Sequence, residues 1–274
     1  MEKRFGIIGN PVKGSLSPLL FGAAYGGRFA YDLIEEPGFD KAWERFLEGY
    51  HGINVTAPFK EDAFRKAGVI TPSAEAVGAA NLIVKTPLGT EAHNTDFLGI
   101  KMIIAETVSN SYTDTPRALI VGCGGAGRAA AAAAAQSGFK TTVMNRSAGR
   151  ARALAEALPE YCLEVAPVQE LGGRLRDSDL VIYTVPSAMD GLRELREDVF
   201  APTGRGPKVL LEANYKTPSF SGELLETLHK GGCRYISGLR WLLLQAVAGY
   251  GIFTGLDPDA EAMRKVIGNI AENH

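Results

Sequence analysis

One glycine-rich segment constrains the fold of this chain more than any other feature. A short apolar run at residues 118–121 leads into the pattern Gly-x-Gly-x-x-Gly, whose glycines are Gly122, Gly124 and Gly127. The first glycine permits a tight turn from strand to helix, the second lets the backbone approach a pyrophosphate, and the third lets the helix lie close to the strand. The N–H groups and the dipole at the start of that helix attract phosphates. The alternative is a glycine-rich turn that binds no ligand.

The elements predicted around this segment favour a nucleotide site. Helices are predicted over residues 125–138 and 150–158, and strands over residues 118–121, 141–144, 180–183 and 209–211. This alternation of strands and helices predicts a parallel, doubly wound sheet. The alanine-rich residues 129–135 reflect either helix propensity alone or close packing of a small-residue helix on the sheet, and we favour the packing.

The segment after the second of these strands indicates which nucleotide binds. A site for NAD usually has an acidic residue there, about 20 residues beyond the glycines, which bonds to the ribose hydroxyls. This chain has Asn145, Arg146 and Ser147 instead, followed by Arg150. Because a guanidinium binds a 2′-phosphate through paired, charged hydrogen bonds, the segment predicts NADP. The alternative is that the arginines lie in the solvated first turn of a helix.

Residues 1–100 also alternate strands and helices. Strands are predicted over residues 5–9, 31–34, 53–55, 81–86 and 91–94, with a hairpin turn at residues 87–89. Helices are predicted over residues 96–106, 239–253 and 258–272, and another opens at Pro58. Ser17 and Pro18 are predicted to be the N-cap and the first residue of a further helix. The polar residues 109–115 are the predicted linker to the second half of the chain.

Polar side chains gather at the ends of the strands predicted in this first half. They lie in residues 15–17, 54–60, 78–81 and 94–96. Ligands of open α/β sheets bind at strand ends, and hydroxyl and amide groups suit a polyhydroxylated acid. Lys60 and Asp96 would form an acid–base pair, because an ammonium stabilises and protonates the alkoxide that hydride transfer to a ketone leaves. The alternatives are that Asp96 and Ser17 cap helices and that Lys60 lies on the surface.

Taken together, these motifs resemble those of the shikimate dehydrogenase family over residues 5–256. The family's serine pair is similar to Ser15 and Ser17, and its Asn-Val-Thr-x-Pro-x-Lys motif to residues 54–60. Its further motifs match residues 78–81, 94–99, 122–128 and 145–150, and then Gly238, Leu239 and Gln245. The motifs occur in the family's order and at similar spacing, which makes a chance match of the set improbable.

The resemblance implies a two-domain α/β protein that reversibly reduces 3-dehydroshikimate to shikimate with NADPH, in aromatic amino-acid biosynthesis. An N-terminal α/β substrate domain would comprise residues 1–100 and 239–274, and a Rossmann-type, doubly wound NADP-binding domain residues 101–238. Lys60 and Asp96 would be catalytic. The substrate would be held by Ser15, Ser17, Thr56, Lys60, Asn81, Asp96, Tyr215 and Gln245. The cofactor would be held by Gly122, Gly124, Gly125, Ala126, Gly127, Arg128, Asn145, Arg146, Ser147, Arg150 and Gly238.

Several segments depart from the family's pattern. Residues 183–187 replace Asn-Ala/Thr-Thr-x-x-Gly-Met, residues 212–215 replace Asp-x-x-Tyr before a shorter loop, and Arg240 and Trp241 replace Gly-Met. All of them are expected where the nicotinamide end of the cofactor binds. A paralogue that acts on quinate or a related acid, and a non-catalytic relative that binds NADP and a metabolite, therefore stay open as alternatives.

The composition excludes several other classes of function. The 274 residues suit two domains of roughly 100–150 residues each. The formal net charge of −2 gives no basic surplus for nucleic acid or an anionic membrane. The three cysteines form no Cys-x-x-Cys pair and the four histidines lack metal-ligand spacing, so we expect reduced thiols, a cytoplasmic protein and no metal. No signal peptide or membrane span is predicted, and we expect a monomer or homodimer.

Overall fold

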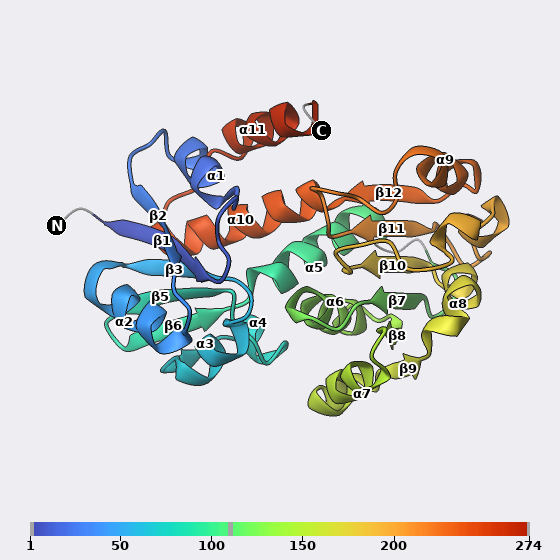
Figure 1. The fold of residues 1–274 in the computed structure, drawn as a ribbon, viewed down its shortest axis with the longest axis horizontal. Coiled ribbons are helices and arrows are strands. Elements are labelled where there is room, and N and C mark those ends of the chain that lie inside the picture. The colour runs from blue at the N-terminus through green and yellow to red at the C-terminus, as the bar shows by residue number, and fades with distance from the viewer. Residues whose placement is uncertain (1–2, 109–111, 273–274) are drawn as a thin grey trace. The chain divides into compact units, whose positions relative to one another are not determined.

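The chain folds into two compact units (Figure 1). The structure is a computed structural model that describes residues 3–108 and 112–272. Unit 1 comprises the chain up to Gly99 and from Leu242 onward, and unit 2 comprises Ile100–Trp241. The boundaries fall inside two helices, α5 (Thr95–Val108) and α10 (Gly238–Thr254). They lie close to residues 100 and 239, where the sequence placed them.

The predicted linker at residues 109–115 is wrong as a boundary. Residues 109–111 lie outside the described residues, and Thr113 belongs to unit 2, where its N–H donates to the carbonyl of Arg205 at 2.9 Å. Of the described residues, 113–115 are exposed and lie in a loop before the next strand. The boundary lies within α5 instead, because a helix satisfies its own backbone hydrogen bonds and can continue from one unit into the next.

Unit 1 contains a six-stranded sheet in which only one strand is reversed. In spatial order its strands are β2 (Ala30–Glu35), β1 (Arg4–Gly9), β3 (Gly52–Val55), β5 (Leu82–Thr86), β6 (Gly89–His93) and β4 (Val69–Ile70). β5 pairs antiparallel with β3 and β6, which confirms the predicted hairpin, and the other pairs are parallel. The start of β5 therefore lies at the same edge as the ends of β1, β3 and β6.

The helices of unit 1 begin slightly differently from the prediction. Besides α5 and α10, they are α1 (Ser17–Ala24), α2 (Phe39–Gly49), α3 (Lys60–Lys66), α4 (Pro72–Glu75) and α11 (Ala260–Glu272). Ser17 is not the N-cap of α1: Leu16 holds that position without a side-chain bond, and Ser17 N–H donates to Ser15 Oγ at 3.2 Å. Pro58 lies in the turn before α3 and not in its first turn.

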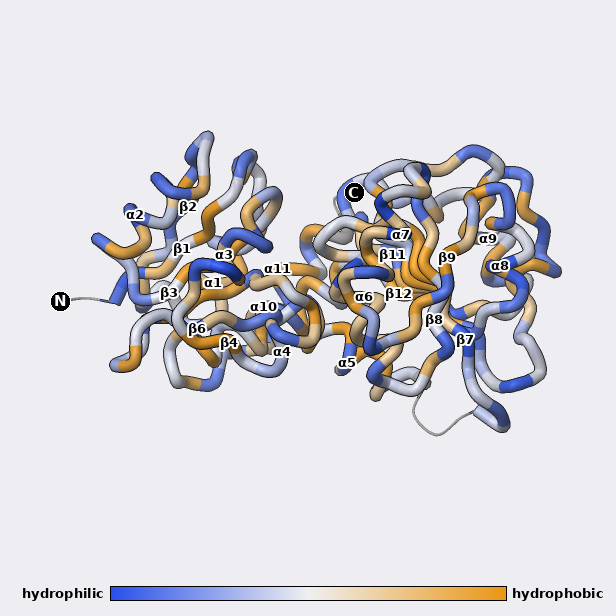
Figure 2. The backbone as a smooth tube through the Cα atoms, turned by 90° about the horizontal axis from the view of Figure 1, so that it is seen from below, coloured by the Kyte–Doolittle hydropathy of each residue, from blue (hydrophilic) through white to orange (hydrophobic). Residues whose placement is uncertain are grey.

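Unit 2 contains a parallel sheet with the strand order of a dinucleotide-binding domain. In spatial order its strands are β12 (Arg234–Ser237), β11 (Val209–Glu212), β10 (Leu180–Tyr183), β7 (Arg117–Val121), β8 (Lys140–Met144) and β9 (Glu164–Ala166). Read from β9, this is the order 3-2-1-4-5-6, which confirms the predicted doubly wound sheet. β10 and β11 are buried throughout, as expected of strands covered on both faces. The backbone at β11 is coloured as hydrophobic in Figure 2.

The alanine-rich helix packs closely on this sheet, as the sequence predicted. The helices of unit 2 are α6 (Gly125–Gln136), α7 (Ala148–Ala157), α8 (Leu171–Asp177) and α9 (Gly222–Lys230), with 3₁₀ turns at Pro159–Tyr161, Val168–Glu170, Leu192–Glu194 and Glu197–Phe200. Residues 129–134 of α6 are fully buried, and α6 contacts β7, β8 and β10. The helix ends before residue 138, because Gly138 takes a left-handed conformation at φ +87°. Among the described residues, no helix is both long and apolar enough to cross a membrane.

A buried ionic cluster lies where β10 begins in unit 2. The Asp179 side chain is fully buried and accepts hydrogen bonds from Arg205 Nε at 2.9 Å, from Arg117 N–H at 2.8 Å and from the Thr203 hydroxyl. A buried carboxylate is tolerated only when it is paired and hydrogen-bonded in this way. The cluster therefore ties the segment before β11 to the starts of β7 and β10.

Removing one member of this cluster should destabilise the fold strongly. Asp179→Ala should lower the free energy of unfolding by about 3–5 kcal/mol, because Arg205 loses its carboxylate and the Arg117 N–H its acceptor. Asp198→Ala is the control, since the Asp198–Arg176 pair is more than half exposed and should contribute less than about 1 kcal/mol. Urea unfolding of both variants measures the difference. Equal losses would show that the cluster contributes no more than a surface pair.

Candidate functional site

The edge of the unit 1 sheet gathers the polar residues that the sequence placed at strand ends. Ser15 and Ser17 follow β1, and Thr56 follows β3. Asn81 directly precedes the reversed strand β5, and Asp96 follows β6. All of these positions belong to one edge because β5 runs antiparallel to its neighbours. The reversal explains how a residue before a strand joins residues that follow strands.

Lys60 and Asp96 form an ion pair at this edge. Lys60 Nζ lies 2.6 Å from Asp96 Oδ2, and the side chains are 17% and 16% exposed, so the pair is shielded yet remains accessible to a small molecule. Asp96 is the second residue of α5, where the helix dipole favours a carboxylate. It is not the N-cap, because Asn94 Oδ1 accepts the N–H of Phe97 at 3.0 Å.

A buried chain of hydrogen bonds runs beside the ion pair. Asn81 Oδ1 accepts the N–H of Thr95 at 2.7 Å, and Asn81 Nδ2 donates to Thr95 Oγ1 at 3.0 Å. Thr95 Oγ1 in turn donates to Gln245 Oε1 at 3.0 Å, which joins α5 to α10 within unit 1. Gln245 Nε2 donates one hydrogen to the carbonyl of Leu242 at 3.1 Å, which leaves its second hydrogen for a ligand.

Two tyrosines that the sequence did not single out support this edge: Tyr250 contacts the serine pair, and Tyr31 contacts Asn54. Ser15 Oγ donates to Ser17 Oγ at 3.1 Å, and the hydroxyl of Tyr250 donates to the Ser17 carbonyl at 3.0 Å. The hydroxyl of Tyr31 donates to Asn54 Oδ1 at 2.7 Å. Burial raises the pKa of both Tyr31 and Tyr250, so each stays a neutral donor. Tyr31 lay in a predicted strand and Tyr250 in a predicted helix, but no local pattern indicated the hydrogen bonds that they form.

Thr56 and Tyr215 complete the predicted substrate residues. The Thr56 N–H donates to the Ile8 carbonyl at 2.9 Å, and its methyl group lies so close to Gly9 that a Cβ there would collide with it. Tyr215 lies in unit 2, in the loop after β11, and burial raises its pKa. The structure thus brings together in unit 1 all the predicted substrate residues except Tyr215.

In the loop between β7 and α6, glycine is present at each position for a different structural reason. Gly122 takes a left-handed conformation at φ +104°. A Cβ on Gly127 would collide with the Gly122 carbonyl, so the third glycine is required by the packing of α6 on β7. A Cβ on Gly124 would meet nothing within 4 Å. The chain itself does not require glycine at position 124, and the backbone there is open to a ligand, as a pyrophosphate site demands.

The loop after β8 lies against the glycine loop and carries free cationic groups. Asn145 Oδ1 accepts the Cys123 N–H at 3.3 Å, and Asn145 Nδ2 donates to the Ser147 carbonyl at 3.2 Å. Arg146 and Arg150 are exposed, and within the described part of the chain neither forms an ion pair with a carboxylate. The charges of these two guanidinium groups therefore remain available to an anionic ligand.

The remaining predicted cofactor residues divide into two groups. Gly125, Ala126 and Arg128 lie in the first turn of α6, beside the open backbone of the glycine loop. Gly238 opens α10, where a Cβ would collide with the carbonyls of Ala213 and Glu212. Packing against the end of β11 therefore accounts for glycine at position 238 without a ligand.

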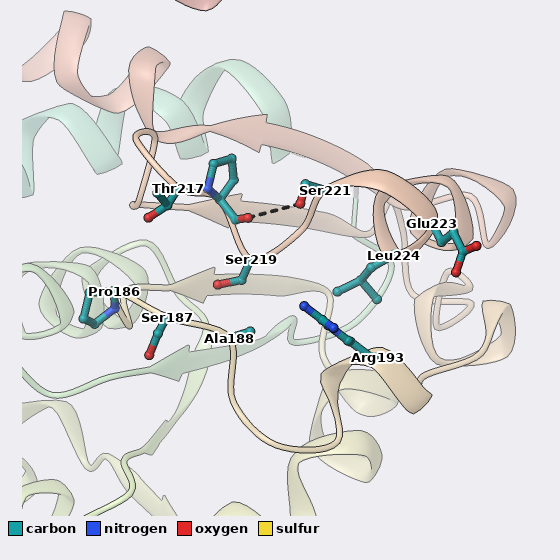
Figure 3. Close-up of a pocket in the computed structure, with 10 residues that line it drawn as sticks. Pro186, Ser187, Ala188, Arg193, Thr217, Ser219, Ser221, Glu223 and Leu224 are labelled. Carbon is teal, nitrogen blue, oxygen red and sulfur yellow. Dashed lines mark hydrogen bonds between the residues drawn. The ribbon is translucent and has the colours of Figure 1, made fainter. Parts of the chain in front are cut away.

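A cavity of about 470 Å³ lies between the loops that follow β10 and β11 (Figure 3), and one segment that departs from the family's pattern, residues 183–187, contributes Pro186 and Ser187 to its lining. It is lined by Pro186, Ser187, Ala188, Arg193, Thr217, Pro218, Ser219, Ser221, Glu223 and Leu224. The buried Tyr183 hydroxyl donates to the Ser187 carbonyl at 2.8 Å and accepts the Met189 N–H at 3.0 Å, and burial raises its pKa to about 12. Tyr183 therefore fixes the loop that forms one wall.

The other wall is fixed by a fully buried carboxylate. Glu212 accepts the N–H of Ser219 at 2.5 Å, the N–H of Phe220 at 3.1 Å and the hydroxyl of Tyr235 at 3.0 Å.

In the part of the chain that is described, no group of three or more His, Cys, Asp or Glu side chains could hold a metal ion. The two candidate sites are therefore an acid–base pair among hydroxyl and amide groups in unit 1 and a nucleotide loop in unit 2.

Comparison with known proteins gives one consistent result. Residues 7–83 match the model of the shikimate dehydrogenase substrate binding domain, and residues 104–194 match that of shikimate / quinate 5-dehydrogenase. The chain is 35% identical over 276 residues to the shikimate dehydrogenase (NADP(+)) of Halorubrum lacusprofundi, covering 96% of this chain and 97% of that relative. It is 34% identical over 278 residues to the enzyme of the same name from Moorella thermoacetica, covering 95% and 91%.

A solved structure agrees in fold over the whole chain. It is shikimate 5-dehydrogenase of Thermus thermophilus in complex with NADP(H) and shikimate, with 28% identity and a TM-score of 0.77. The match covers 97% of this chain and 99% of that one. The relatives thus match both units of the chain together.

The glycine loop supplies a matched pair of substitutions. Gly127→Ala should lower the free energy of unfolding by about 1–3 kcal/mol, because the new Cβ collides with a backbone carbonyl that cannot move freely. Gly124→Ala should leave stability nearly unchanged, because its Cβ meets open space, and should weaken NADPH binding instead. Thermal unfolding and fluorescence titration with NADPH separate the two effects. If Gly124→Ala bound NADPH as tightly as the wild type, position 124 would have no role in binding.

Proposed function

The chain belongs to the shikimate dehydrogenase family, and we propose that it reversibly reduces 3-dehydroshikimate to shikimate with NADPH, in aromatic amino-acid biosynthesis. The observation that carries this proposal is the Lys60–Asp96 ion pair at a sheet edge lined with hydroxyl and amide groups. The wild-type test is a steady-state assay of shikimate and quinate with both nicotinamide cofactors. Turnover of shikimate with NADP is the expected result.

The polar groups of unit 1 suit the substrate's chemistry. We assign the substrate carboxylate to the hydroxyls of Ser15 and Ser17, which are preorganised by their mutual hydrogen bond. The ring hydroxyls would be held by Thr56, Asn81, Asp96 and Gln245, together with Lys60. Tyr215, which lies in unit 2, stays a prediction from the family's motif. An amide or hydroxyl already fixed by the protein loses little freedom when it binds a ligand, which favours affinity.

Lys60 and Asp96 supply the proton chemistry. When bound, NADPH supplies the hydride. The oxygen of the substrate carbonyl gains negative charge during reduction, and the Lys60 ammonium stabilises that charge and donates the proton. In the reverse direction the neutral amine accepts the proton from the substrate hydroxyl. Asp96 holds the ammonium in one orientation through their ion pair at 2.6 Å.

The residues of unit 2 fit the cofactor. The open backbone at Gly124 and the first turn of α6 would hold the pyrophosphate, with Gly122 and Gly127 shaping the loop and Gly125, Ala126 and Arg128 flanking it. Arg146 and Arg150, with Asn145 and Ser147 between the strand and α7, would hold the 2′-phosphate. Gly238 directly follows β12, on the other side of the sheet from β8, and would border the cofactor there. Neither guanidinium group has a carboxylate partner among the residues that the structure describes, which supports the preference for NADPH over NADH.

The setting of the reaction follows from the cysteines. All of Cys123, Cys162 and Cys233 are free thiols, which favours a reducing compartment, and we place the enzyme in the cytoplasm as a monomer or homodimer. Quinate turnover above shikimate turnover would assign the chain to the quinate branch of the family. Binding of NADPH and shikimate without turnover would make it a non-catalytic sensor.

The acid–base role of Lys60 gives a direct test. Lys60→Ala should lower kcat by about two to four orders of magnitude, the usual range for loss of a positioned acid or base. NADPH affinity should be unchanged, since Lys60 belongs to unit 1. If Lys60 and Asp96 act as one unit, Lys60→Ala/Asp96→Asn should turn over little more slowly than the slower single variant. Multiplicative losses would show independent roles, and near wild-type turnover by Lys60→Ala would remove it from the mechanism.

Cofactor preference tests the role of Arg146. Arg146→Ala removes a charged hydrogen-bond partner of the 2′-phosphate, a loss of roughly 1.5–3 kcal/mol, so kcat/KM for NADPH should fall about 10- to 150-fold while that for NADH barely moves. Arg146→Asp should shift the ratio further, because it repels the phosphate and can bond the ribose hydroxyls.

Arg150 can share the phosphate, so the double variant Arg146→Ala/Arg150→Ala is measured beside the single ones. The quantity compared across the series is the ratio of kcat/KM for NADPH to kcat/KM for NADH. A constant ratio, even in the double variant, would show that the arginines do not select the cofactor.

A further inference from the structure

The helix that carries Ser17 begins without the usual side-chain cap. Leu16 holds the N-cap position of α1, and a leucine side chain has no oxygen that could accept the N–H groups of the first turn. Ser15 Oγ accepts the Ser17 N–H at 3.2 Å instead, and Pro18 has no N–H to satisfy. The place of Ser17 at the start of α1 therefore depends on bonds that residues outside the helix supply.

Tyr250 of α10 supplies such a bond to the other end of the Ser17 backbone. Its hydroxyl donates to the Ser17 carbonyl at 3.0 Å, and the two residues are only 2% and 8% exposed. Both belong to unit 1, although they are 233 positions apart in the sequence. Ser17 is thus held at its N–H by Ser15 and at its carbonyl by Tyr250, and this sets the direction of its side chain.

Tyr250 is itself fixed at its ring and at its backbone. The ring packs edge-on against that of Phe21 of α1, with 4.9 Å between the centroids, and lies nearly parallel to that of Phe253 at 6.3 Å. The backbone carbonyl accepts hydrogen bonds from the hydroxyls of Tyr25 at 2.8 Å and Thr254 at 3.1 Å. A side chain that is already ordered in this way can hold the Ser17 carbonyl at little further cost in entropy.

Packing alone does not account for a tyrosine at position 250. Its neighbours Phe21 and Phe253 are apolar rings, and phenylalanine would make the same ring contacts. A buried hydroxyl costs free energy unless it forms a hydrogen bond, and this hydroxyl donates to one of the predicted substrate residues. The oxygen of Tyr250 therefore has a role that its ring does not fill.

We propose that Tyr250 is a positioning residue, which aims the Ser17 hydroxyl at the substrate carboxylate by holding the Ser17 carbonyl. The proposal rests on the proposed function, in which Ser15 and Ser17 bind that carboxylate. In this role Tyr250 acts through Ser17 and makes no contact with the substrate. Its loss should weaken substrate binding and leave the proton chemistry of Lys60 and Asp96 intact.

A double-mutant cycle with Ser17 tests the proposal. Tyr250→Phe should raise KM for shikimate about five- to tenfold, the scale of one lost hydrogen bond, with kcat changed less than about twofold. Ser17→Ala keeps the carbonyl and removes the hydroxyl, so in that background Tyr250→Phe should raise KM less than about twofold further. Tyr25→Phe is the control and should keep the wild-type KM. It removes a hydroxyl from the same aromatic cluster, one that bonds to the Tyr250 carbonyl instead of to Ser17.

The possible results separate a positioning role from a purely structural one. A wild-type KM for Tyr250→Phe, an equal rise in KM in both backgrounds, or the same rise for Tyr25→Phe would each overturn the positioning role. If Tyr250→Phe does not fold, Tyr250→para-fluorophenylalanine carries the cycle, because fluorine fills most of the space of the hydroxyl and donates no hydrogen. Turnover of shikimate by the wild type tests the proposed function separately. If the wild type binds shikimate without turnover, the Kd of shikimate replaces KM in the same comparison.

Discussion

The hydrogen bonds of Asn81 hold together the edge of the unit 1 sheet on which the proposed active site depends. Its carbonyl accepts the Val55 N–H at 2.7 Å and its N–H donates to the His93 carbonyl at 3.0 Å, so one residue joins the ends of β3 and β6. Its side-chain oxygen fixes the first residue of α5, Thr95. Since Asp96 comes next, the carboxylate that faces Lys60 is placed by a neutral amide, whose burial costs less than that of a further charge.

Unit 2 uses amides in the same way at its ligand edge. Asn145 ties the loop after β8 to the glycine loop, and Asn214 ties the loop after β10 to the loop after β11. Loop backbones lack the partners that a sheet ladder would provide, and an amide can satisfy a donor of one loop and an acceptor of another. The cationic groups are left out of this framework. Among the described residues, neither Arg146 nor Arg150 forms an ion pair with a carboxylate, because neutral side chains shape the loops around them.

The sequence predicted those features whose signals are local. The glycine spacing and the apolar runs around it gave the parallel sheet, and the alanines of α6 gave its close packing on that sheet. The sequence analysis did not predict α8 or β12, because their local patterns are weak. α8 contains Gly172 and Gly173, and β12 is only four residues long. The Tyr250–Ser17 bond could not be predicted, because its partners are 233 residues apart. The linker prediction was wrong because the polar composition of residues 113–115 reflects their exposure to solvent. The boundary between the units lies inside the continuous helix α5.

Two departures from the family's pattern, at Tyr183 and Glu212, share a physical property that the sequence alone did not reveal. Tyr183 and Glu212 are almost completely buried, where an unpaired polar group would be costly, and both are satisfied by groups of the loops that follow them. A loop held in this way has lost its conformational freedom on folding, so little ordering remains to oppose ligand binding. A short loop after β11 is therefore compatible with a binding role, because the side chains at its base, Glu212 and Asn214, define its path.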